Sequence, residues 1–569
     1  AFEGRKPSYQ YDESMRRVIL GTPEEASAVA RESARLARGS ASSEEVMQNL
    51  MFSRPEFGAL TSSQRTAVQR ALDERLSLIQ GPPGTGKTHV GCAVIAAWVE
   101  RYGHFGERIL AVADSNVAAD NMYARLEMFG IDAVRVGQGK EVGSANRSGD
   151  ELWRAVKTAR VVIATCIGSG MEMLESRGDA KHFQRVIIDE CTQACETAAL
   201  VALGRSCEQA VLIGDHNQLP ATVLSIAAKN QGLGVSLFER MALTNGLETT
   251  MLVEQRRMHS SIAEFPNMTF YNSRLVNAVE DSALAPVQGF PWPNQDCRVC
   301  FVDVTGSSEM KRGYSAYNSA EAEAVADVIA NLLQAGFPPH ELCILTAYLA
   351  QRDEIRRAIG NRNLWHAQGS LSIDTVDGYQ GMERDLVIFS AARSNAEHRL
   401  GFLADARRMN VMLTRARRGL IVLGHGDALR YSSDTGSHWR GWLEWAEGKG
   451  ATISANELRF APSHQSTTMQ ESSGNMFPAH ASSSSAFPSS ENEFQESLGS
   501  LRSHGDNSSD FVSEEQFATH GLPPVAAPPP PPLKKGSEWE KVYSQQYERH
   551  YYWNKDTNHT QWEVPSGFV

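Results

Sequence analysis

Short runs of hydrophobic residues recur along residues 1–460, and a polar or helix-like stretch follows each run. The runs are rich in Val, Ile and Leu without polar alternation, which is typical of strands in a parallel sheet that helices cover on both faces. A first series spans residues 76–80, 108–113, 161–165, 185–189 and 210–214. A second series begins near residue 343 and continues through 386–390 and 420–424. The pattern predicts an α/β fold with two tandem lobes, each built on a parallel sheet.

The composition changes after residue 460. Residues 462–522 are Ser-rich, with consecutive serines at 482–485, and such a segment buries too little apolar surface to offset its ordering entropy. We therefore predict a disordered linker there. Residues 523–535 are Pro-rich and favour the polyproline II conformation. The expected organisation is an N-terminal remnant at 1–59, lobes at 60–250 and 251–450, the linker at 462–522, the Pro-rich segment at 523–535 and a small aromatic module at 536–567.

The net charge limits the classes of function that the chain can have. The 569 residues include 55 Lys and Arg against 67 Asp and Glu, which gives a formal net charge of −12. Binding a polyanion through counterion release needs clustered cations, so this balance excludes a generally basic nucleic-acid coat protein. A local binding groove is still compatible with it.

The eight cysteines are scattered, too few for a disulfide framework, and indicate a reducing compartment. Cys297 and Cys300 form the one C-x-x-C pair of the sequence. Because no second Cys/His pair lies nearby, we interpret them as small thiols of a strand rather than as zinc ligands. The longest apolar stretch, residues 90–99, is about half of a membrane span, and no secretory signal is visible at the start. We expect no membrane partner.

A phosphate-binding loop follows the first hydrophobic run. Residues 81–88 read G-P-P-G-T-G-K-T and fit the pattern G-x-x-x-x-G-K-[ST], between a predicted strand and an apolar helix. Glycines allow backbone N–H groups to surround the β-phosphate, and the helix N-terminus adds positive potential. Lys87 is expected to reach the β- and γ-phosphates, and the Thr88 hydroxyl to bind Mg²⁺. The predicted nucleotide-binding residues here are Gly81, Pro82, Pro83, Gly84, Thr85, Gly86, Lys87, Thr88 and His89.

A second sequence element completes a candidate catalytic site for ATP hydrolysis. The run 186–190 reads V-I-I-D-E, about a hundred residues after the phosphate-binding loop. Asp189 suits the magnesium shell, and Glu190 suits the base that orients the attacking water. Arginine clusters at 256–257 and 407–418 could supply a cation across a cleft, so that hydrolysis would depend on lobe closure. From spacing alone, a solvated surface explains these arginines equally well.

A series of ordered motifs resembles superfamily 1 helicases, and most closely the nonsense-mediated-decay (Upf-like) RNA helicase family. The resemblance covers residues 60–446, about two-thirds of the chain. Besides the two elements above, it depends on L-T-S-S-Q at 60–64, A-D-S-N at 113–116, A-T-C at 164–166, G-D-H-N-Q-L-P at 214–220, E-Q-R-R-M-H at 254–259, T-A-Y at 346–348, T-V-D-G-Y-Q-G-M-E at 375–383 and R-R-M-N-V-M-L-T-R-A at 407–416.

The resemblance implies two RecA-like lobes that use ATP and Mg²⁺. It implies an ATP-dependent 5′→3′ helicase or translocase on single-stranded RNA or DNA, with RNA favoured, in RNA processing or decay. By the same resemblance, Gln218 senses the γ-phosphate, and Arg257 and Arg415 are the phosphate-facing arginines. Gln64 would read the adenine, and Glu383 would hold the ribose.

Three departures from the family pattern keep a second interpretation open. Arg256 stands where the family has a Tyr that stacks on adenine, although a planar guanidinium can also stack. The stretch 134–159 is shorter than the usual inserted subdomain, and only about 60 residues precede the first motif; the accessory pieces that grip the strand are then either reduced or supplied by sequence before Ala1. The alternative is therefore a nucleic-acid-stimulated ATPase that remodels complexes without unwinding.

In this family, nucleic acid is contacted largely by backbone amides and hydroxyls at strand ends. The matching positions are Ser115, Asn116, Thr165, Thr346 and Thr375. For each of them, a cap or turn role remains the alternative. Contacts to the backbone carry little sequence information, so we expect binding that does not depend on sequence. We also expect a monomeric motor located in the cytoplasm, the nucleus or both.

The C-terminal module resembles a WW domain. Trp539 and Trp562 lie 23 positions apart, and Pro565 follows the second Trp by three. The resemblance implies a three-stranded all-β module whose groove binds Pro-rich peptides, because aromatic rings dock a preformed polyproline II helix at low entropic cost. The groove residues it implies are Tyr551, Trp553, Thr560 and Trp562. Such a module would tether the motor to Pro-rich partners; alternatively, the protein is a WW adaptor with a nucleotide-gated scaffold.

Overall fold

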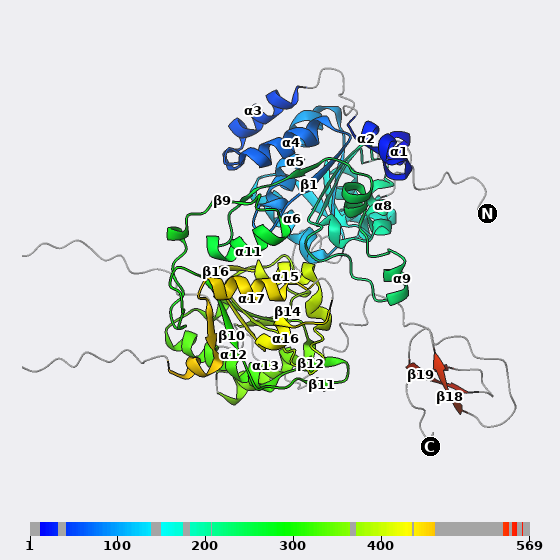
Figure 1. Cartoon of the computed structure of the whole chain (residues 1–569). Coiled ribbons are helices and arrows are strands. Elements are labelled where there is room, and N and C mark those ends of the chain that lie inside the picture. The colour runs from blue at the N-terminus through cyan, green and yellow to red at the C-terminus, as the bar shows by residue number, and fades with distance from the viewer. Residues whose placement is uncertain are drawn as a thin grey trace, which may run out of the picture. The chain divides into compact units, whose positions relative to one another are not determined.

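The computed structural model describes residues 12–31, 41–137, 149–174, 183–205, 207–362, 364, 371–434 and 437–460, and the backbone of three strands between residues 539 and 561. The chain divides into two units, Ala1–Thr467 and Thr468–Val569, which are described separately (Figure 1). The predicted linker at 462–522 and the Pro-rich segment at 523–535 lie outside the described residues, as do Trp562 and Pro565.

The first lobe is built on a seven-stranded sheet in the order β3-β4-β2-β5-β6-β1-β7, and every pairing in it is parallel. Each hydrophobic run of the first predicted series coincides with one of these strands to within one residue, so the α/β prediction is confirmed here. The strands are β1 Leu76–Gln80, β2 Ile109–Ala113, β3 Ala133–Arg135, β4 Val161–Thr165, β5 Arg185–Asp189, β6 Gln209–Gly214 and β7 Thr249–Met251.

Helices cover both faces of this sheet and form a separate hydrophobic core with each (Figure 1). On one face pack α3 Ser43–Ser53, α4 Ser62–Asp73, α5 Lys87–Tyr102 and α6 Asn116–Met128. On the other face pack α1 Glu13–Leu20, α2 Pro23–Ala30, α7 Gly149–Thr158, α8 Glu196–Leu203 and α10 Leu237–Glu239. The short α9, Ile226–Asn230, has no buried residue.

The helices α1 to α3 come from the segment that the sequence indicated only as an N-terminal remnant. They join the first lobe because each is well capped and has an apolar side to bury. Thr22 and Ser42 form capping boxes with Glu25 and Glu45, which satisfy free backbone N–H groups at the starts of α2 and α3. Their buried side chains include Met15, Val18, Ala26, Val29, Val46 and Leu50. The first lobe therefore begins before residue 60 and includes α1 to α3.

The second lobe repeats the architecture with six parallel strands in the order β14-β13-β15-β16-β10-β17. The strands are β10 Val299–Asp303, β13 Leu342–Thr346, β14 Ser372–Thr375, β15 Arg384–Ser390, β16 Ala416–Gly424 and β17 Thr452–Ser454. One face carries α11 Ser260–Phe270, α15 Ala406–Leu413, α16 Gly426–Arg430 and α17 Trp439–Gly448; the other carries α12 Ser319–Gln334 and α13 Leu349–Asn361. The prediction of two parallel-sheet lobes is confirmed.

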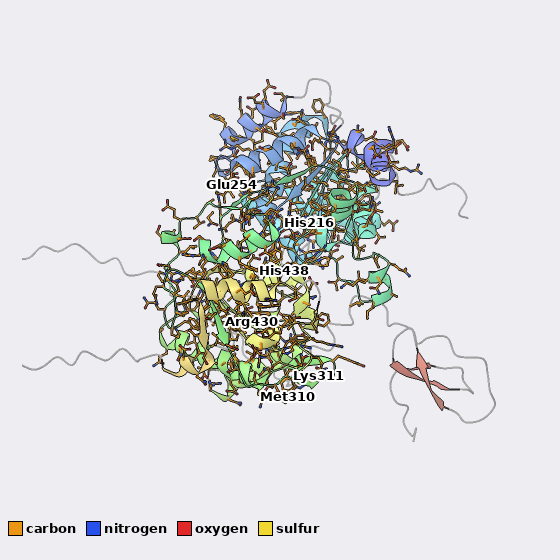
Figure 2. All side chains as sticks on the ribbon, viewed as in Figure 1. His216, Glu254, Met310, Lys311, Arg430 and His438 are labelled. Atoms are coloured by element: carbon orange, nitrogen blue, oxygen red, sulfur yellow. The ribbon has the colours of Figure 1, made fainter. Side chains whose placement is uncertain are left out.

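The connection between the lobes is fixed to the start of α4. Glu254, labelled in Figure 2, lies in the short strand β8, Glu254–Gln255, which pairs with β9, Val276–Asn277. Its carboxylate accepts hydrogen bonds from the Thr61 hydroxyl at 2.8 Å and from the Ser63 hydroxyl. The strand β8 and the first predicted motif are therefore held together.

A buried carboxyl group lies under the loop that follows β15. Glu321 is 0% exposed, and its Oε2 accepts hydrogen bonds from the Ser390 hydroxyl and the Ala392 N–H, both at 2.8 Å. Ala392 has a φ of 65°, a left-handed conformation that costs energy for a residue with a Cβ. Burial raises the pKa of Glu321 to about 7. The carboxyl group thus holds this loop in a strained conformation.

The raised pKa predicts how stability depends on pH. Because the pKa of Glu321 is higher in the folded than in the unfolded state, the folded protein binds the extra proton, and this stabilisation is lost as the pH rises from about 4.5 to 7. Between pH 5 and 8, the wild type should lose about 1–3 kcal/mol more unfolding free energy than Glu321→Gln, measured by urea unfolding. Glu323→Gln, on the same helix, should follow the wild type. Equal pH slopes for wild type and Glu321→Gln would contradict the assignment.

The second unit contains a three-stranded antiparallel sheet in the order β18-β19-β20. The strands are β18 Trp539–Ser544, β19 Arg549–Asn554 and β20 Thr560–Gln561. In their register Trp553 pairs with Thr560, which places two predicted groove positions next to each other. The sheet has the strand number expected of the C-terminal module, but it does not by itself establish a WW domain.

All eight cysteines lie among the described residues and are free thiols. Cys300 is buried in β10, and burial raises the pKa of its thiol. Within the described part of the chain, no group of three or more His, Cys, Asp or Glu side chains is arranged to hold a metal ion. Nor does any helix there have both the length and the apolarity to cross a bilayer.

Candidate active site

The phosphate-binding loop connects β1 to α5 and is held in shape by its own sequence. Gly84 and Gly86 have φ values of 76° and 82°, a region open mainly to glycine. A Cβ on Gly84 would lie 2.7 Å from the Cβ of Arg257, so glycine also permits the close approach of the arginine cluster at 256–257. The Thr85 hydroxyl donates to the Pro82 carbonyl at 2.7 Å. The loop is therefore preformed.

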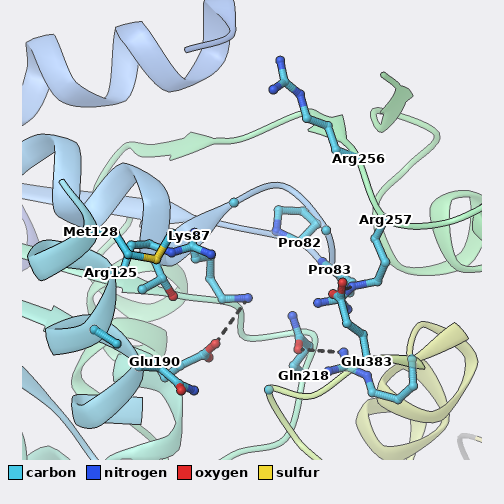
Figure 3. A pocket seen from close by; sticks show the side chains of 17 residues that line it. Pro82, Pro83, Lys87, Arg125, Met128, Glu190, Gln218, Arg256, Arg257 and Glu383 are labelled. Atoms are coloured by element: carbon cyan, nitrogen blue, oxygen red, sulfur yellow. Dashed lines mark hydrogen bonds and ion pairs between the residues drawn. The ribbon is translucent and has the colours of Figure 1, made fainter. Parts of the chain in front are cut away.

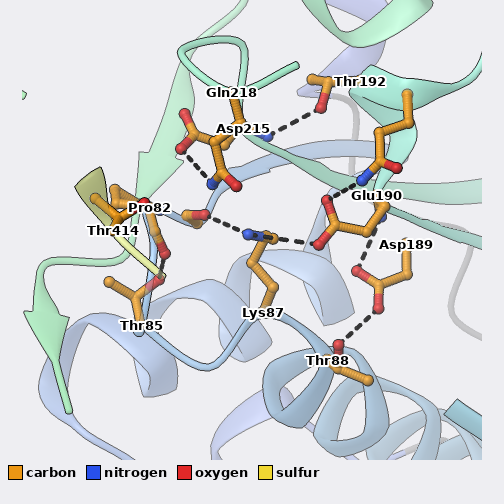
Figure 4. Close-up of polar contacts among 12 residues, drawn as sticks. Pro82, Thr85, Lys87, Thr88, Asp189, Glu190, Thr192, Asp215, Gln218 and Thr414 are labelled. Carbon is orange, nitrogen blue, oxygen red and sulfur yellow. Dashed lines mark hydrogen bonds and ion pairs between the residues drawn. The ribbon is translucent and has the colours of Figure 1, made fainter. Parts of the chain in front are cut away.

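Lys87 and Glu190 face each other at the centre of the site (Figure 4). The Lys87 Nζ donates to the Gly81 carbonyl at 2.9 Å and lies 3.6 Å from Oε1 of Glu190. Glu190 follows the end of β5 with a φ of 50°, and its carboxylate accepts a 3.0 Å hydrogen bond from Nε2 of Gln193. The ammonium group suited to bind phosphate and the carboxylate suited to orient a water molecule thus form an ion pair with each other.

Thr88 and Asp189 provide oxygen ligands beside them. The Thr88 hydroxyl donates to Oδ2 of Asp189 at 2.9 Å, and Asp189 is 2% exposed. Burial and the neighbouring Glu190 raise the pKa of Asp189 to about 6. Mg²⁺ prefers oxygen ligands, and a bound cation would offset the cost of this buried negative charge. The residues present therefore fit a magnesium ion accompanying a nucleotide.

Arginines of the second lobe reach the same space. Nη2 of Arg415 donates to Oε1 of Gln218 at 3.5 Å. Arg415 is 1% exposed, and burial together with Arg257 lowers its pKa to about 9, so the guanidinium stays charged at neutral pH. Arg257 donates from Nε to the Glu383 carboxylate and from Nη1 to the Thr414 carbonyl at 3.0 Å. Arg415 thus contacts the first lobe directly, whereas the hydrogen bonds of Arg257 stay within the second lobe; both arginines line the same cleft.

These side chains line one cleft of about 490 Å³, a usual volume for a ligand site (Figure 3). All five predicted catalytic residues are among its lining residues, although they come from both lobes. The lining comprises Pro82, Pro83, Gly84, Gly86, Lys87, Thr88, Asn121, Ala124, Arg125, Met128, Glu190, Gln218, Arg256, Arg257, Gly381, Glu383 and Arg415. The structure thus brings together residues up to 333 positions apart, from Pro82 to Arg415.

Comparison with known proteins shows what each of the two lobes resembles. Residues 59–154 and 152–226 match one family model described as an AAA domain, and residues 233–427 match a second model with the same description. "Regulator of nonsense transcripts 1" of Dictyostelium discoideum is 34% identical over 419 residues, 65% of this chain and 31% of that protein. "ATP-dependent helicase NAM7" of Saccharomyces cerevisiae is 35% identical over 432 residues, 66% of this chain and 43% of that protein. The two lobes are thus similar in sequence to Upf-like superfamily 1 helicases.

The chain spans 31% and 43% of the lengths of these two relatives. Among solved structures, that of the arterivirus nonstructural protein 10 (helicase) with DNA has a TM-score of 0.38 and 15% identity, and covers 67% of this chain and 65% of that chain. A likeness this weak supports no further conclusion. The similarity to these helicases therefore depends on the sequence matches, and it is confined to the two lobes.

Several residues with predicted nucleotide contacts have other partners in the helicase lobes. Gln64 is 4% exposed and is not among the cleft-lining residues. Its Oε1 accepts from the Thr61 N–H and its Nε2 donates to the Thr85 carbonyl, both at 2.9 Å. Its side chain therefore braces the phosphate-binding loop. Arg256 is exposed at the rim of the cleft and donates to the Ala59 carbonyl at 3.4 Å.

The cleft also contains residues that the motifs did not reveal. Asn121, Arg125 and Met128 come from successive turns of α6 and line the cleft beside the phosphate-binding loop. Next to it, the ring of His89 lies 5.5 Å from that of Phe129, and burial, with Arg125 adding to the effect, lowers the pKa of His89. No sequence signal could have found the α6 residues, because their role depends on how that helix packs beside α5.

A chain of buried hydrogen bonds joins the helicase lobes behind the cleft. The Tyr271 hydroxyl donates to Oδ2 of Asp215 at 2.8 Å and accepts from Nδ2 of Asn410 at 2.7 Å. The same Asp215 oxygen accepts from Nε2 of Gln218 at 2.8 Å (Figure 4). Asp215 belongs to the first lobe and Asn410 to α15 of the second. The position of Gln218 is thus linked to the arrangement of both lobes.

The predicted nucleic-acid residues lie at the carboxyl edges of the two sheets. In the first lobe, Thr165 at the end of β4 pairs with Ala113 at the end of β2, two positions before Ser115. In the second lobe, Thr346 at the end of β13 pairs with Thr375 at the end of β14. The structure therefore groups the candidates of each lobe at one edge of its sheet.

Within each group the side chains also have local structural partners. Ser115 caps α6 by accepting from the Ala118 N–H at 3.1 Å, and Asn116 accepts from Arg135 at 2.9 Å. The Thr165 hydroxyl accepts from the Gly168 N–H at 2.9 Å, and that of Thr375 from the Gly378 N–H at 3.2 Å. These bonds agree with the cap and turn alternative, and they also hold the strand ends in position. A nucleic-acid role for these residues remains a prediction.

Proposed function

We propose that the two lobes hydrolyse ATP and use it to move 5′→3′ along single-stranded nucleic acid, with RNA favoured over DNA. The observation that carries this proposal is the interlobe cleft, where Lys87 and Glu190 of the first lobe face Arg257 and Arg415 of the second. An ATP held there would contact both lobes, so hydrolysis would change the contacts between them. Chemistry and movement would then be coupled.

Each residue has a definite part in the proposed reaction. Glu190 orients the attacking water and accepts its proton. Lys87, Arg257 and Arg415 neutralise the charge that develops on the transferred phosphoryl group. A magnesium ion held by Thr88 and Asp189 would neutralise charge on the β- and γ-phosphates. Gln218, bonded to Asp215 and Arg415, connects the reaction to the interlobe hydrogen bonds.

The names of the relatives support a role in RNA decay. One is a regulator of nonsense transcripts and the other an ATP-dependent helicase. Because this chain spans less than half of either, that role is proposed for it from the motor portion alone. We further propose that the motor acts as a monomer in the cytoplasm, the nucleus or both.

The test measures the ATPase rate of the full chain with poly-RNA, with single-stranded DNA or with neither. We expect the rate to rise most with RNA, and a duplex with a 5′ single-stranded tail to be unwound in preference to one with a 3′ tail. Stimulation without unwinding of either duplex would favour the remodelling ATPase instead. An ATPase rate unaffected by any nucleic acid would contradict both.

We also propose that the second unit is a WW domain that tethers the motor to Pro-rich partners. The three antiparallel strands and the Trp553–Thr560 pairing support it. Tethering two binding modules in one chain can raise local concentrations to the millimolar range. The test is binding of a fluorescent Pro-rich peptide by the full chain and by Trp553→Ala, which we expect to lose it. If the wild-type chain binds the peptide but has no ATPase activity, the adaptor alternative is favoured.

A further inference from the structure

An exposed phenylalanine lies at the carboxyl edge of the second sheet. Phe402 belongs to the short 3₁₀ helix Gly401–Ala404, in the loop between β15 and α15. Its side chain is 60% exposed, whereas its sequence neighbour Leu403 is 4% exposed. Exposed apolar side chains are common on protein surfaces, so the position of this ring, more than its exposure, is what bears on function.

The strand register places this loop beside the predicted nucleic-acid residues. Thr346 at the end of β13 pairs with Thr375 on one side and with Ser390, the last residue of β15, on the other. All three strands therefore end at the same edge. The loop that leaves β15 at Ser390 carries Phe402, so this ring shares the edge with Thr346 and Thr375.

Ring contacts place Phe402 between those two threonines. The Phe402 ring centroid lies 6.1 Å from that of Tyr348, two residues after Thr346. The Arg408 guanidinium lies 5.3 Å from the Phe402 ring centroid. Arg408 also pairs with Asp377, two residues after Thr375, with a 3.0 Å contact. The ring is thus adjacent to both strand-end turns of the second lobe.

The backbone that carries the ring is held firmly. The buried Tyr348 donates its hydroxyl hydrogen to the Leu400 carbonyl at 2.8 Å. The Gly401 N–H donates to Oδ2 of Asp434 at 3.1 Å, and Nη1 of Arg408 donates to the Phe402 carbonyl at 3.3 Å. A fixed, exposed ring next to a cation loses little entropy when it binds a flat ligand, which is the general advantage of preorganisation.

We propose that Phe402 is a stacking platform for one base of the bound single strand, with Arg408 as its supporting cation. This inference depends on the proposed nucleic-acid function and adds a base contact to it. Every base presents a π-face, so stacking on an aromatic ring tolerates any sequence, and a nearby guanidinium adds favourable electrostatics. Thr375, which is half-buried whereas Thr346 is 0% exposed, would contact the backbone of the strand, and Phe402 would hold a base.

The experiment compares normal and abasic strands. Binding of a fluorescent twelve-nucleotide oligo-U and of the same strand with abasic sites throughout is measured for the full chain, for Phe402→Ala and for Phe402→Leu. We expect both substitutions to weaken binding of the normal strand about tenfold, as the loss of one base–aromatic stack predicts. Binding of the abasic strand should change little. Phe402→Trp should restore binding of the normal strand.

A matched control is Phe52→Ala, because Phe52 is 91% exposed on α3 and belongs to no site described above. It should leave both affinities unchanged. Equal weakening for normal and abasic strands, or no weakening with Phe402→Ala, would overturn the stacking role; the latter would leave Phe402 as a contact for a protein partner. If the wild type binds neither strand, the proposed nucleic-acid function itself fails, which is a distinct result.

Discussion

Replacing Glu190 with Gln is expected to lower the maximal rate of nucleic-acid-stimulated ATP hydrolysis about 10²–10⁴-fold, the usual contribution of a general base. The amide keeps the size of the side chain and its hydrogen bond with Gln193, but it cannot accept the proton of the attacking water. It also removes the negative charge 3.6 Å from Nζ of Lys87. ATP binding should therefore persist or tighten. Single-turnover phosphate release and binding of a fluorescent ATP analogue separate the two effects.

The control for this substitution is Glu100→Gln. Glu100 is exposed on α5, the helix that begins at the phosphate-binding loop, and lies away from the cleft. Glu100→Gln removes one negative charge, as Glu190→Gln does, and should leave the hydrolysis rate unchanged. Unaltered turnover in Glu190→Gln would show that another group activates the water.

Replacing Arg415 is expected to have the larger effect. Arg415→Ala should lower turnover about 10³–10⁵-fold, the range over which an arginine stabilises a phosphoryl-transfer transition state. Arg415→Lys should recover little of this, because the guanidinium also donates from Nε to the Val411 carbonyl at 2.8 Å and from Nη2 to Gln218. A lysine cannot make these contacts and reach the nucleotide at the same time. The measurement is the steady-state kcat at saturating ATP and RNA.

Because Arg415 is buried, its replacement also affects the fold, so thermal unfolding of each variant must be recorded. The matched control is Arg417→Ala, two residues along: its side chain is 46% exposed, and it pairs at 3.6 Å with Asp385. This control should retain full activity. Turnover within tenfold of wild type in a folded Arg415→Ala variant would remove Arg415 from the chemistry and leave Arg257 as the second-lobe cation to test.

The parts of the site that adjoin each other in sequence were the predictable ones. The phosphate-binding loop takes its shape from glycines at positive φ between a strand and a helix, all within residues 76–102. Asp189 and Glu190 end a buried strand. The hydrophobic runs likewise predicted two parallel sheets, because strands covered on both faces need apolar residues throughout.

The partners of these residues could not be predicted, because they come from distant parts of the chain. Gln64 matched a motif for reading adenine, but its amide is hydrogen-bonded to Thr85. Tyr271 matched no chemical role, yet its hydroxyl joins residues 56 and 139 positions away. A local sequence pattern shows only which hydrogen bonds a side chain is able to form. Which of them it forms depends on the groups that tertiary packing places next to it.

By itself, then, the amino-acid sequence determined the α/β lobes, the phosphate-binding loop and the identities of the acidic and basic groups, since these depend on residue type and short-range spacing. The tertiary structure decided that Arg257 and Arg415 face Lys87 and Glu190 across a cleft. It also decided that Phe402 stays exposed between two strand ends. Both outcomes follow from the packing of two separately folded sheets, which brings together side chains that the linear order keeps apart.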